Sequence, residues 1–108
     1  MKVDNLSNYV RGWIVGSFSP TLYDRNDCEI GIKYYKAGDS EQAHTHKLSD
    51  ECSVIALGSV KINGELHEEG SIVIKHKGDV ADFKCISERA IVVVFRPDGS
   101  FPNDKEKV

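Results

Sequence analysis

The chain has 108 residues, with 14 Lys and Arg against 17 Asp and Glu, so its formal net charge is -3. This length fits one domain, spanning residues 1–108, with one modest core. The acidic balance and the lack of a basic cluster argue against a nucleic-acid partner. The longest apolar run, 90–95, is far shorter than the ~20 residues that cross a bilayer, and the N-terminus has no apolar signal segment. We therefore expect a cytoplasmic protein with no membrane partner.

The cysteines also favour a cytoplasmic, reducing compartment. Cys28, Cys52 and Cys85 are odd in number and lack CxxC spacing, which is typical of reduced thiols rather than of a disulfide framework. We expect all three to be core or near-core residues.

Taken in chain order, the apolar segments predict short β-strands, and no segment of helical length has apolar residues three and four positions apart. Segment 28–36 alternates Ile30, Ile32 and Tyr34 with charged residues and glycine, as a half-buried strand does. Aromatic residues on such strands pack into a barrel core more often than they line a cavity. The predicted strands are 13–15, 28–36, 52–57, 59–62, 71–75, 82–86 and 90–96.

Turn signals separate these strands. Asn63-Gly64 is the strongest hairpin signal because both residues tolerate positive φ, and His67 after it reads as a solvated loop residue. Short strands at such regular spacing predict an all-β, single-domain antiparallel β-barrel or sandwich, since closure removes exposed edges. From about residue 97 the chain reads as an extended C-terminal tail, with Phe101 as an anchor.

The segment from residue 38 to 58, GDSEQAHTHKLSDECSVIALG, carries the chemistry. His44 and His46 share one face of an extended segment because residues i and i+2 do so. Glu51 would return on the neighbouring strand to that face, and two imidazoles with one carboxylate suit Zn, Fe, Mn or Ni with positions left open. The simpler alternative is that these are exposed loop residues.

This segment resembles the first motif of the cupin superfamily: a glycine, five residues, HxH, a glutamate and a further glycine. Gly38, His44, His46, Glu51 and Gly58 match it. The resemblance implies a double-stranded β-helix jelly roll, a β-barrel whose motif residues face a cavity and commonly hold a divalent metal.

The second cupin motif is matched only in part. Gly70 and Gly78 fit, but His76 and Cys85 stand at the positions of proline and asparagine. Ala81 replaces the histidine that would complete the metal site, and a methyl group does not ligate. His44, His46 and Glu51 are then the remaining metal ligands.

Three neighbours are candidates for a replacement fourth ligand. Strand alternation sends Asp82 to the face opposite Ala81, Asp79 lies at a turn, and His76 needs a shift of register. None of the three is favoured.

Two interpretations of the site stay open. In the first, His44, His46 and Glu51 bind a divalent metal that polarises an oxygen-rich small molecule. In the second, no metal is bound and the same residues bind ligand directly, with one histidine as acid or base.

A finer resemblance, carried by segment 12–20, Asp82-Phe83 and Asn103-Asp104-Lys105, is to small single-domain cupins of bacteria and phages. Some of these occur beside surface-polysaccharide enzymes, which implies a sugar or sugar-nucleotide ligand. We expect a homodimeric small-molecule-binding protein. An isomerase-, epimerase- or dioxygenase-like enzyme, a binding module and a structural or assembly protein all remain open.

Overall fold

The computed structural model describes residues 1–99 and 105–107. Phe101, Asn103 and Asp104 lie outside these residues. Apart from a short 3-10 helix, η1 (Leu6–Asn8), the secondary structure in this part of the chain is β-strand, which confirms the all-β prediction. The strands are β1 (Trp13–Val15), β2 (Glu29–Lys36), β3 (Ser40–His46), β4 (Glu51–Leu57), β5 (Ser59–Ile62), β6 (Glu65–Glu68), β7 (Ile72–Lys75), β8 (Val80–Cys85), β9 (Arg89–Arg96) and β10 (Lys105–Lys107).

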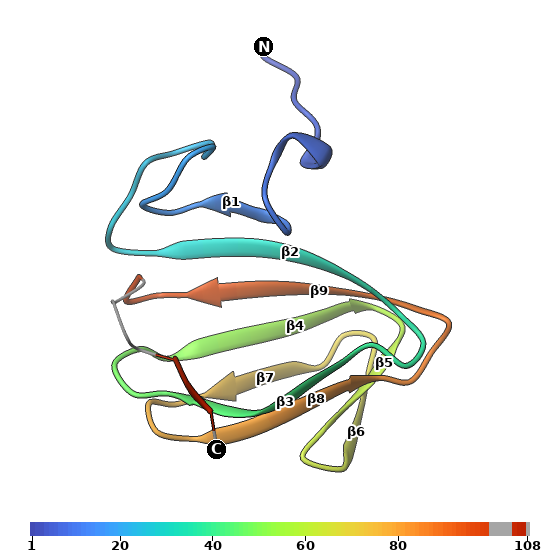
Figure 1. Ribbon diagram of the computed structural model, residues 1–108. Coiled ribbons are helices and arrows are strands. Elements are labelled where there is room, and N and C mark those ends of the chain that lie inside the picture. The colour runs from blue at the N-terminus through green and yellow to red at the C-terminus, as the bar shows by residue number, and fades with distance from the viewer. Residues whose placement is uncertain (100–104, 108) are drawn as a thin grey trace.

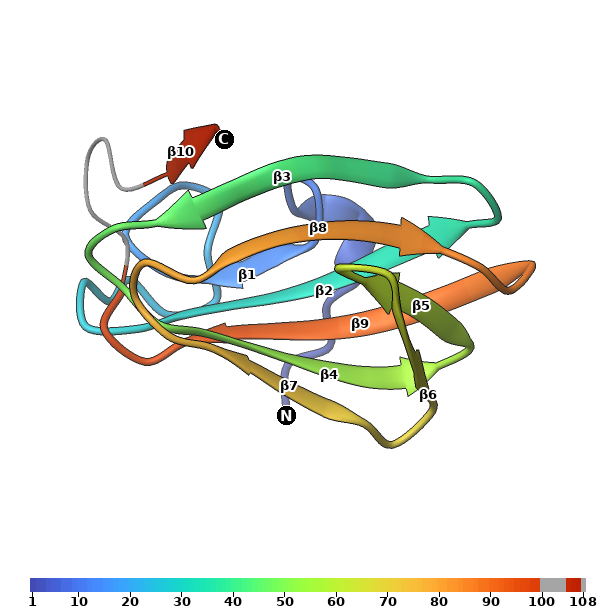
Figure 2. The same ribbon diagram turned by 90° about the horizontal axis from the view of Figure 1, so that it is seen from below.

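The strands form two antiparallel five-stranded sheets that lie face to face (Figures 1 and 2). Sheet A has the order β1-β2-β9-β4-β7, and sheet B the order β10-β3-β8-β5-β6. Chain neighbours β3 and β4 therefore belong to opposite sheets, as do β8 and β9. This repeated crossing makes the double-stranded jelly roll that the resemblance implied.

The turn at Asn63-Gly64 is confirmed, with φ of 52° and 78°, the left-handed conformation that a two-residue hairpin needs at both positions. The hairpin it closes includes β6, so His67 lies on a strand and not in a loop as predicted. At the end of the chain, β10 is exposed and also pairs with β3, placing Lys105 opposite His46 and Lys107 opposite His44.

The apolar core occupies the interior near β5 and the adjoining parts of β4, β8 and β9. Its most buried side chains are those of Ile55, Val60, Val92 and Cys85. The three cysteines are free thiols, and Cys28 and Cys52 are only half-buried. The core prediction therefore holds fully for Cys85 alone.

Strand β2 faces the opposite way from what its apolar pattern suggests. Glu29 and Gly31 are buried, whereas Tyr34 is 62% exposed. The charged and small residues of β2 point inward because the interior beside this strand is a polar cavity. Its isoleucines lie on the outer surface of sheet A.

No helix among the described residues has the length and apolar character needed to cross a membrane.

Candidate functional site

A cavity of about 300 Å³ lies between the two sheets, beside β2. Trp13, Tyr35 and Phe83 form part of its wall, while also packing against the apolar core. Its charged lining consists of Arg11, Lys33, Lys75, Arg96 and Lys105 against Glu41, Glu51 and Asp82. Cations therefore outnumber carboxylates by five to three around the cavity.

The structure brings the histidines and the glutamate of the first motif together. His44 and His46, on β3, have ring centroids 5.4 Å apart, and Glu51 Oε2 lies 3.4 Å from His46 Nε2. All three residues are buried, which excludes the exposed-loop alternative. The expected route was wrong in one respect: Glu51 does not return on a strand neighbouring β3, because β4 pairs with β7 and β9 in the other sheet. The carboxylate meets the imidazoles across the interior.

The orientation of His44 is fixed by its own strand. Its Nδ1 lies 3.0 Å from the carbonyl oxygen of Gln42, and a carbonyl only accepts hydrogen bonds, so Nδ1 carries the proton. The neutral ring then has its lone pair at Nε2. Since His44 lines the cavity, it offers a base to whatever the cavity holds.

Ala81 lies directly opposite His44 in the β3–β8 ladder and lines the same cavity. A longer side chain there would stand beside the imidazole, so the substitution removes a potential ligand at the site itself. The three candidate replacements, Asp82, Asp79 and His76, make contacts elsewhere. Asp82 accepts a hydrogen bond from the backbone of Asn63, and Asp79 accepts one from the backbone of His76. The His76 ring is exposed and lies near Asp50.

Arg96, on β9, is the centre of the buried polar cluster. Its Nε donates to Glu51 Oε2 at 2.9 Å, one terminal nitrogen lies 3.3 Å from Glu29 Oε1, and the other lies 3.3 Å from His46 Nε2. A guanidinium only donates hydrogen bonds, so the histidine nitrogen is the acceptor in this contact. Arg96 thus bridges both sheets at the floor of the cavity.

Lys75, on β7, completes the cluster by donating to Glu51 Oε1 at 2.8 Å. Burial alone would raise the pKa of Glu51, but the adjacent charges and hydrogen bonds of Lys75 and Arg96 outweigh it and lower the pKa to about 2. Burial raises the pKa of Glu29, and the charge of Arg96 opposes that rise. Glu51 is therefore held firmly as a carboxylate.

This arrangement does not fit a divalent metal. Such an ion would need the Nε2 lone pair of His46 and a free oxygen of Glu51, yet both oxygens accept from cations and Arg96 contacts His46 as well. A dication beside a guanidinium would also be repelled. Over the described residues, 1–99 and 105–107, no three His, Cys, Asp or Glu side chains are grouped to hold a metal ion. The guanidinium of Arg96 thus contacts two of the atoms that a metal ion would need as ligands.

Lys33 stands at the mouth of the cavity over Trp13. Its Nζ lies 4.1 Å from the indole centroid and donates to the carbonyl oxygen of Arg11 at 2.6 Å. Burial, and then the charge of Arg11, lower the pKa of this ammonium to about 8. Gly31 makes the arrangement possible, since a Cβ there would lie 2.8 Å from the Trp13 ring, closer than packed carbon atoms approach.

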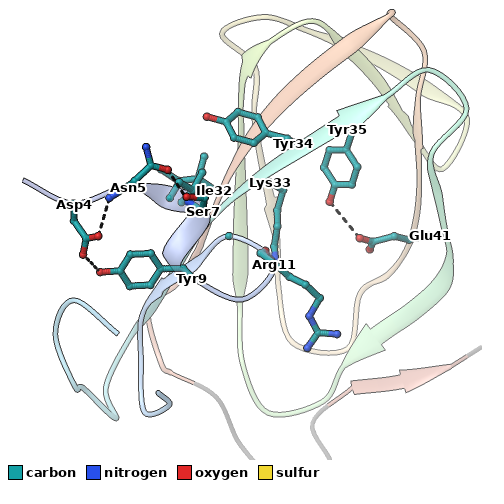
Figure 3. Close-up of a pocket in the computed structure, with 12 residues that line it drawn as sticks. Asp4, Asn5, Ser7, Tyr9, Arg11, Ile32, Lys33, Tyr34, Tyr35 and Glu41 are labelled. Atoms are coloured by element: carbon teal, nitrogen blue, oxygen red, sulfur yellow. Dashed lines mark hydrogen bonds between the residues drawn. The ribbon is translucent and has the colours of Figure 1, made fainter. Parts of the chain in front are cut away.

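A second hollow, a groove of about 850 Å³, runs from the cavity mouth along η1 (Figure 3). Arg11, Lys33, Tyr35 and Glu41 line both spaces, so the groove leads into the cavity. Tyr35 donates a hydrogen bond to Glu41 at 3.3 Å, and burial raises the pKa of its phenol. The groove gives a bound molecule room to extend toward the N-terminal segment.

Sequence reasoning found the motif residues but missed the cations around them, namely Arg11, Lys33, Lys75 and Arg96. One signal was available. The face of β2 opposite its isoleucines reads Glu29, Gly31, Lys33 and Tyr35, and a polar face on a strand next to a binding motif is itself a candidate for the cavity wall. Nothing local marks Lys75 or Arg96, because each ends an otherwise apolar strand, as many surface residues do.

Comparison with known proteins finds solved structures of similar fold. No protein-family model matches the chain, and no curated protein matches its sequence. An uncharacterized conserved protein with a double-stranded β-helix domain, from Klebsiella pneumoniae, superimposes with a TM-score of 0.73 at 20% identity, over 99% of this chain and 91% of that one.

Two further solved structures agree in fold. Oxalate decarboxylase from Bacillus subtilis, an enzyme with Mn(II) centres, gives a TM-score of 0.67 at 20% identity over 77% of this chain and 24% of its own length. A cupin-2 domain containing protein from Shewanella frigidimarina gives 0.57 at 17% identity, over 68% and 74%. Identities this low show the fold and not the chemistry of any one neighbour. This chain has the double-stranded β-helix fold of a small cupin.

Proposed function

We propose that this protein binds a small, anionic, oxygen-rich metabolite in its cavity without a metal ion. The observation that carries the proposal is the surplus of lysine and arginine around the cavity, together with the place that Arg96 takes between His46 and Glu51. The metal-free alternative of the sequence analysis therefore has more support than the metal-bound one.

The charge balance identifies where the anion would bind. Arg96 and Lys75 are matched by Glu29 and Glu51, so the inner cluster is close to neutral. Lys33 and Arg11 line both the cavity and the groove, and one carboxylate, that of Glu41, lines both spaces with them among the described residues. A carboxylate or phosphate next to Lys33 would supply the counter-charge that this desolvated ammonium lacks.

The residues that line the cavity indicate which chemical groups the ligand carries. Trp13 and Tyr35 offer apolar surface, and buried Ser53 and His44 offer hydrogen-bonding groups. A cavity of this size is at the lower end of small-molecule sites. A sugar that carries a carboxylate or phosphate group fits this combination. A purely structural role is less well supported, because side chains leave the cavity open.

His44 favours a second candidate, an isomerase- or epimerase-like activity on the same ligand. Its Nδ1 proton is held by the carbonyl oxygen of Gln42 and the residue lines the cavity, so that Nε2 is left as the nitrogen that would act as a general base. Turnover that His44→Gln abolishes while ligand binding persists would establish this activity.

Metal analysis of protein purified without a histidine tag tests the first part of the proposal. We expect substoichiometric zinc, iron, manganese and nickel in the wild type and no change in His44→Ala or His46→Ala. Stoichiometric metal in the wild type that is lost in both variants would overturn the metal-free site.

Isothermal titration calorimetry with citrate, glucuronate and glucose 6-phosphate tests the anion site, with glucose as the neutral comparison. Lys33→Met should weaken anion binding at least about tenfold, the value of a charged hydrogen bond. Lys61→Met, an exposed lysine on β5, should have no effect. Affinity of the wild type should also fall as the pH rises above 8, because Lys33 then loses its charge. Equal binding of glucose, or no loss in Lys33→Met, would contradict the proposal.

A further inference from the structure

Lys33 lies where the cavity and the groove meet. Lys33 and Tyr35 share the inner face of β2, because they are two positions apart on the strand, and both line the two hollows. Figure 3 shows the Lys33 side chain directed toward Arg11, with Tyr35 alongside. Lys33 is half-buried. Its nitrogen is therefore sheltered from bulk water and still open to a molecule that enters from the groove.

A tight turn beside β2 fixes the position of this nitrogen. The backbone N–H of Trp13 donates to the carbonyl oxygen of Val10 at 3.0 Å, and the two residues between them, Arg11 and Gly12, have φ of 50° and 80°. Positive φ at both central positions is the pattern of a type I′ turn. The carbonyl oxygen of Arg11 accepts a hydrogen bond from Lys33 Nζ at 2.6 Å. The turn thus anchors a side chain that would otherwise be mobile.

The conformation of Arg11 is unfavourable by itself. Left-handed backbone is costly for residues other than glycine, asparagine and aspartate, and such strain persists only where the surroundings impose it, often at functional sites. Gly12 holds the turn against β2, since the backbone N–H of Ile32 donates to its carbonyl oxygen at 2.9 Å. A Cβ on Gly12 would lie 1.9 Å from the carbonyl oxygen of Ile32. The strained residue is the one that holds Lys33.

Lys33 differs in its partners from Lys75, a half-buried lysine that lines the same cavity. Lys75 donates to a carboxylate oxygen of Glu51 at 2.8 Å. Over residues 1–99 and 105–107, Lys33 forms no ion pair with a carboxylate. Its contacts are a neutral carbonyl oxygen and the indole face of Trp13. Lys33 is therefore a cavity lysine whose charge is not matched by a carboxylate in direct contact.

A lysine in such surroundings is a nucleophile toward carbonyl carbon. Lysines that are desolvated, or that lie next to another cation, keep part of their nitrogen as the uncharged amine and form imines with carbonyl compounds. Burial, and then the charge of Arg11, lower the pKa of Lys33 to about 8, against ~10.4 for an exposed lysine. At pH 7 the amine fraction of Lys33 is then greater by roughly a hundredfold. One N–H remains with the Arg11 carbonyl oxygen, which leaves the lone pair free to react.

We propose that Lys33 binds its ligand covalently, by reversible condensation of its amine with the carbonyl group of an oxo acid held where the cavity and the groove meet. The lone pair of Nζ forms a bond to the carbonyl carbon, and the π electrons of the carbonyl group move to its oxygen. The two amine hydrogens pass to that oxygen as protons. The C–O bond then breaks, water leaves, and a C=N bond remains. No oxidant or reductant is required.

Arg11 indicates why the carbonyl compound carries a carboxylate. Its side chain lines both hollows together with Lys33, and a guanidinium pairs with a carboxylate through two parallel hydrogen bonds. In an oxo acid the carbonyl carbon is bonded to the carboxylate, so one small molecule can reach both residues. The choice of an acid rests on the proposed function, whereas formation of the imine does not depend on it.

Reductive trapping of the full chain at pH 7 tests the covalent step. Pyruvate is added with sodium cyanoborohydride, which reduces an imine to a stable secondary amine, and peptide mass spectrometry locates the modified lysines. We expect Lys33 to react at least about tenfold faster than exposed Lys61, because much more of it is amine. Lys75 should stay unmodified, because Glu51 holds its ammonium. Reaction of Lys33 no faster than Lys61, or equal reaction of Lys33 and Lys75, would overturn the proposal.

Hydroxyacetone, a neutral ketone of similar size, tests the class of ligand. The rate at Lys33 relative to Lys61 should be at least about fivefold higher with pyruvate than with hydroxyacetone, because a charged hydrogen bond contributes that much. Arg11→Asn should remove this preference, and asparagine tolerates the left-handed conformation of the turn. The matched control is Arg25→Asn at an exposed arginine, which should keep the preference.

The two proposals fail in different ways. If Lys33 is preferred but pyruvate and hydroxyacetone react equally, the anion site and the choice of an oxo acid are overturned, and the imine stands. If citrate binds in calorimetry but Lys33 is not trapped, the imine is overturned, and the anion site stands.

Discussion

The two ends of the barrel interior contain opposite kinds of side chain, apolar at one end and charged at the other. At the end near β5, Ile55, Val60 and Val92 pack into a core without a charged group. At the end near β2, half-buried Arg96 pairs with buried Glu29 and Glu51. The same strand, β9, supplies Val92 to one end and Arg96 to the other.

The difference shows which end serves stability. Burial of apolar surface stabilises the fold directly, whereas burial of an ion pair gains little because desolvation offsets the attraction. The charged end is therefore better explained by the proposed anion site than by stability. Substitutions at the two ends should separate these roles.

Substitution of Arg96 should cause the largest loss of unfolding free energy. Arg96→Ala leaves Glu29 and Glu51 buried with one cation, Lys75, and should cost about 3–5 kcal/mol of unfolding free energy in urea denaturation. The matched control is Arg25→Ala, which breaks the exposed pair with Asp27 and should cost less than about 1 kcal/mol.

Urea denaturation of a variant in which Glu29 and Glu51 are neutralised together with Arg96 tests whether the unpaired charges cause the loss of stability. Arg96→Met combined with Glu29→Gln and Glu51→Gln should be more stable than Arg96→Ala, because no unpaired charge stays buried. Equal losses in Arg96→Ala and Arg25→Ala would show that the cluster is not a tightly coupled buried network.

Lowering the pH should have the next largest effect on the free energy of unfolding, because it protonates Glu51. Its pKa is about 2 in the folded protein against 4.5 ordinarily, so its contribution is complete above about pH 4.5 and is lost as the pH falls toward 2. Between pH 6 and pH 3 this loss amounts to about 2 kcal/mol. Glu29, with its raised pKa, acts in the opposite direction. Chemical denaturation across this range should show a shallower acid loss in Glu51→Gln than in the wild type.

A change at the apolar end should have the smallest effect and leave binding intact. Ile55 is fully buried, and Ile55→Val should cost about 1 kcal/mol. Anion affinity, followed by calorimetry, should stay at the wild-type value. A loss of anion affinity in Ile55→Val that accompanies its loss of stability would mean that the two ends of the interior are coupled.

The fold could be predicted largely from the sequence because its signals are local. Asn63-Gly64 specifies a hairpin through backbone conformation alone, and strand alternation is visible in single segments. The motif glycines and histidines have fixed spacing, so they indicated both the fold and the place of the site. Ala81 was correctly read as a position facing that site, since it pairs with His44.

The direction in which β2 faces could not be predicted in the same way. Alternation shows that Ile30 and Lys33 lie on opposite faces, but not which face is inside. That choice depends on what the other sheet presents, and here it presents a polar cavity. The ion cluster was equally hidden, because Lys75, Arg96 and Glu51 are distant in sequence and meet only through the sheet ladder.

The sequence by itself thus determined most of the strands, though not β3, β6 or β10, together with the hairpin and the three residues of the motif, since each depends on short-range conformation or fixed spacing. The tertiary structure alone decided that Arg96 lies between His46 and Glu51, and that the isoleucines of β2 face outward. Both depend on contacts between strands of distant sequence, where the balance of desolvation and charge pairing is set by the assembled sheets.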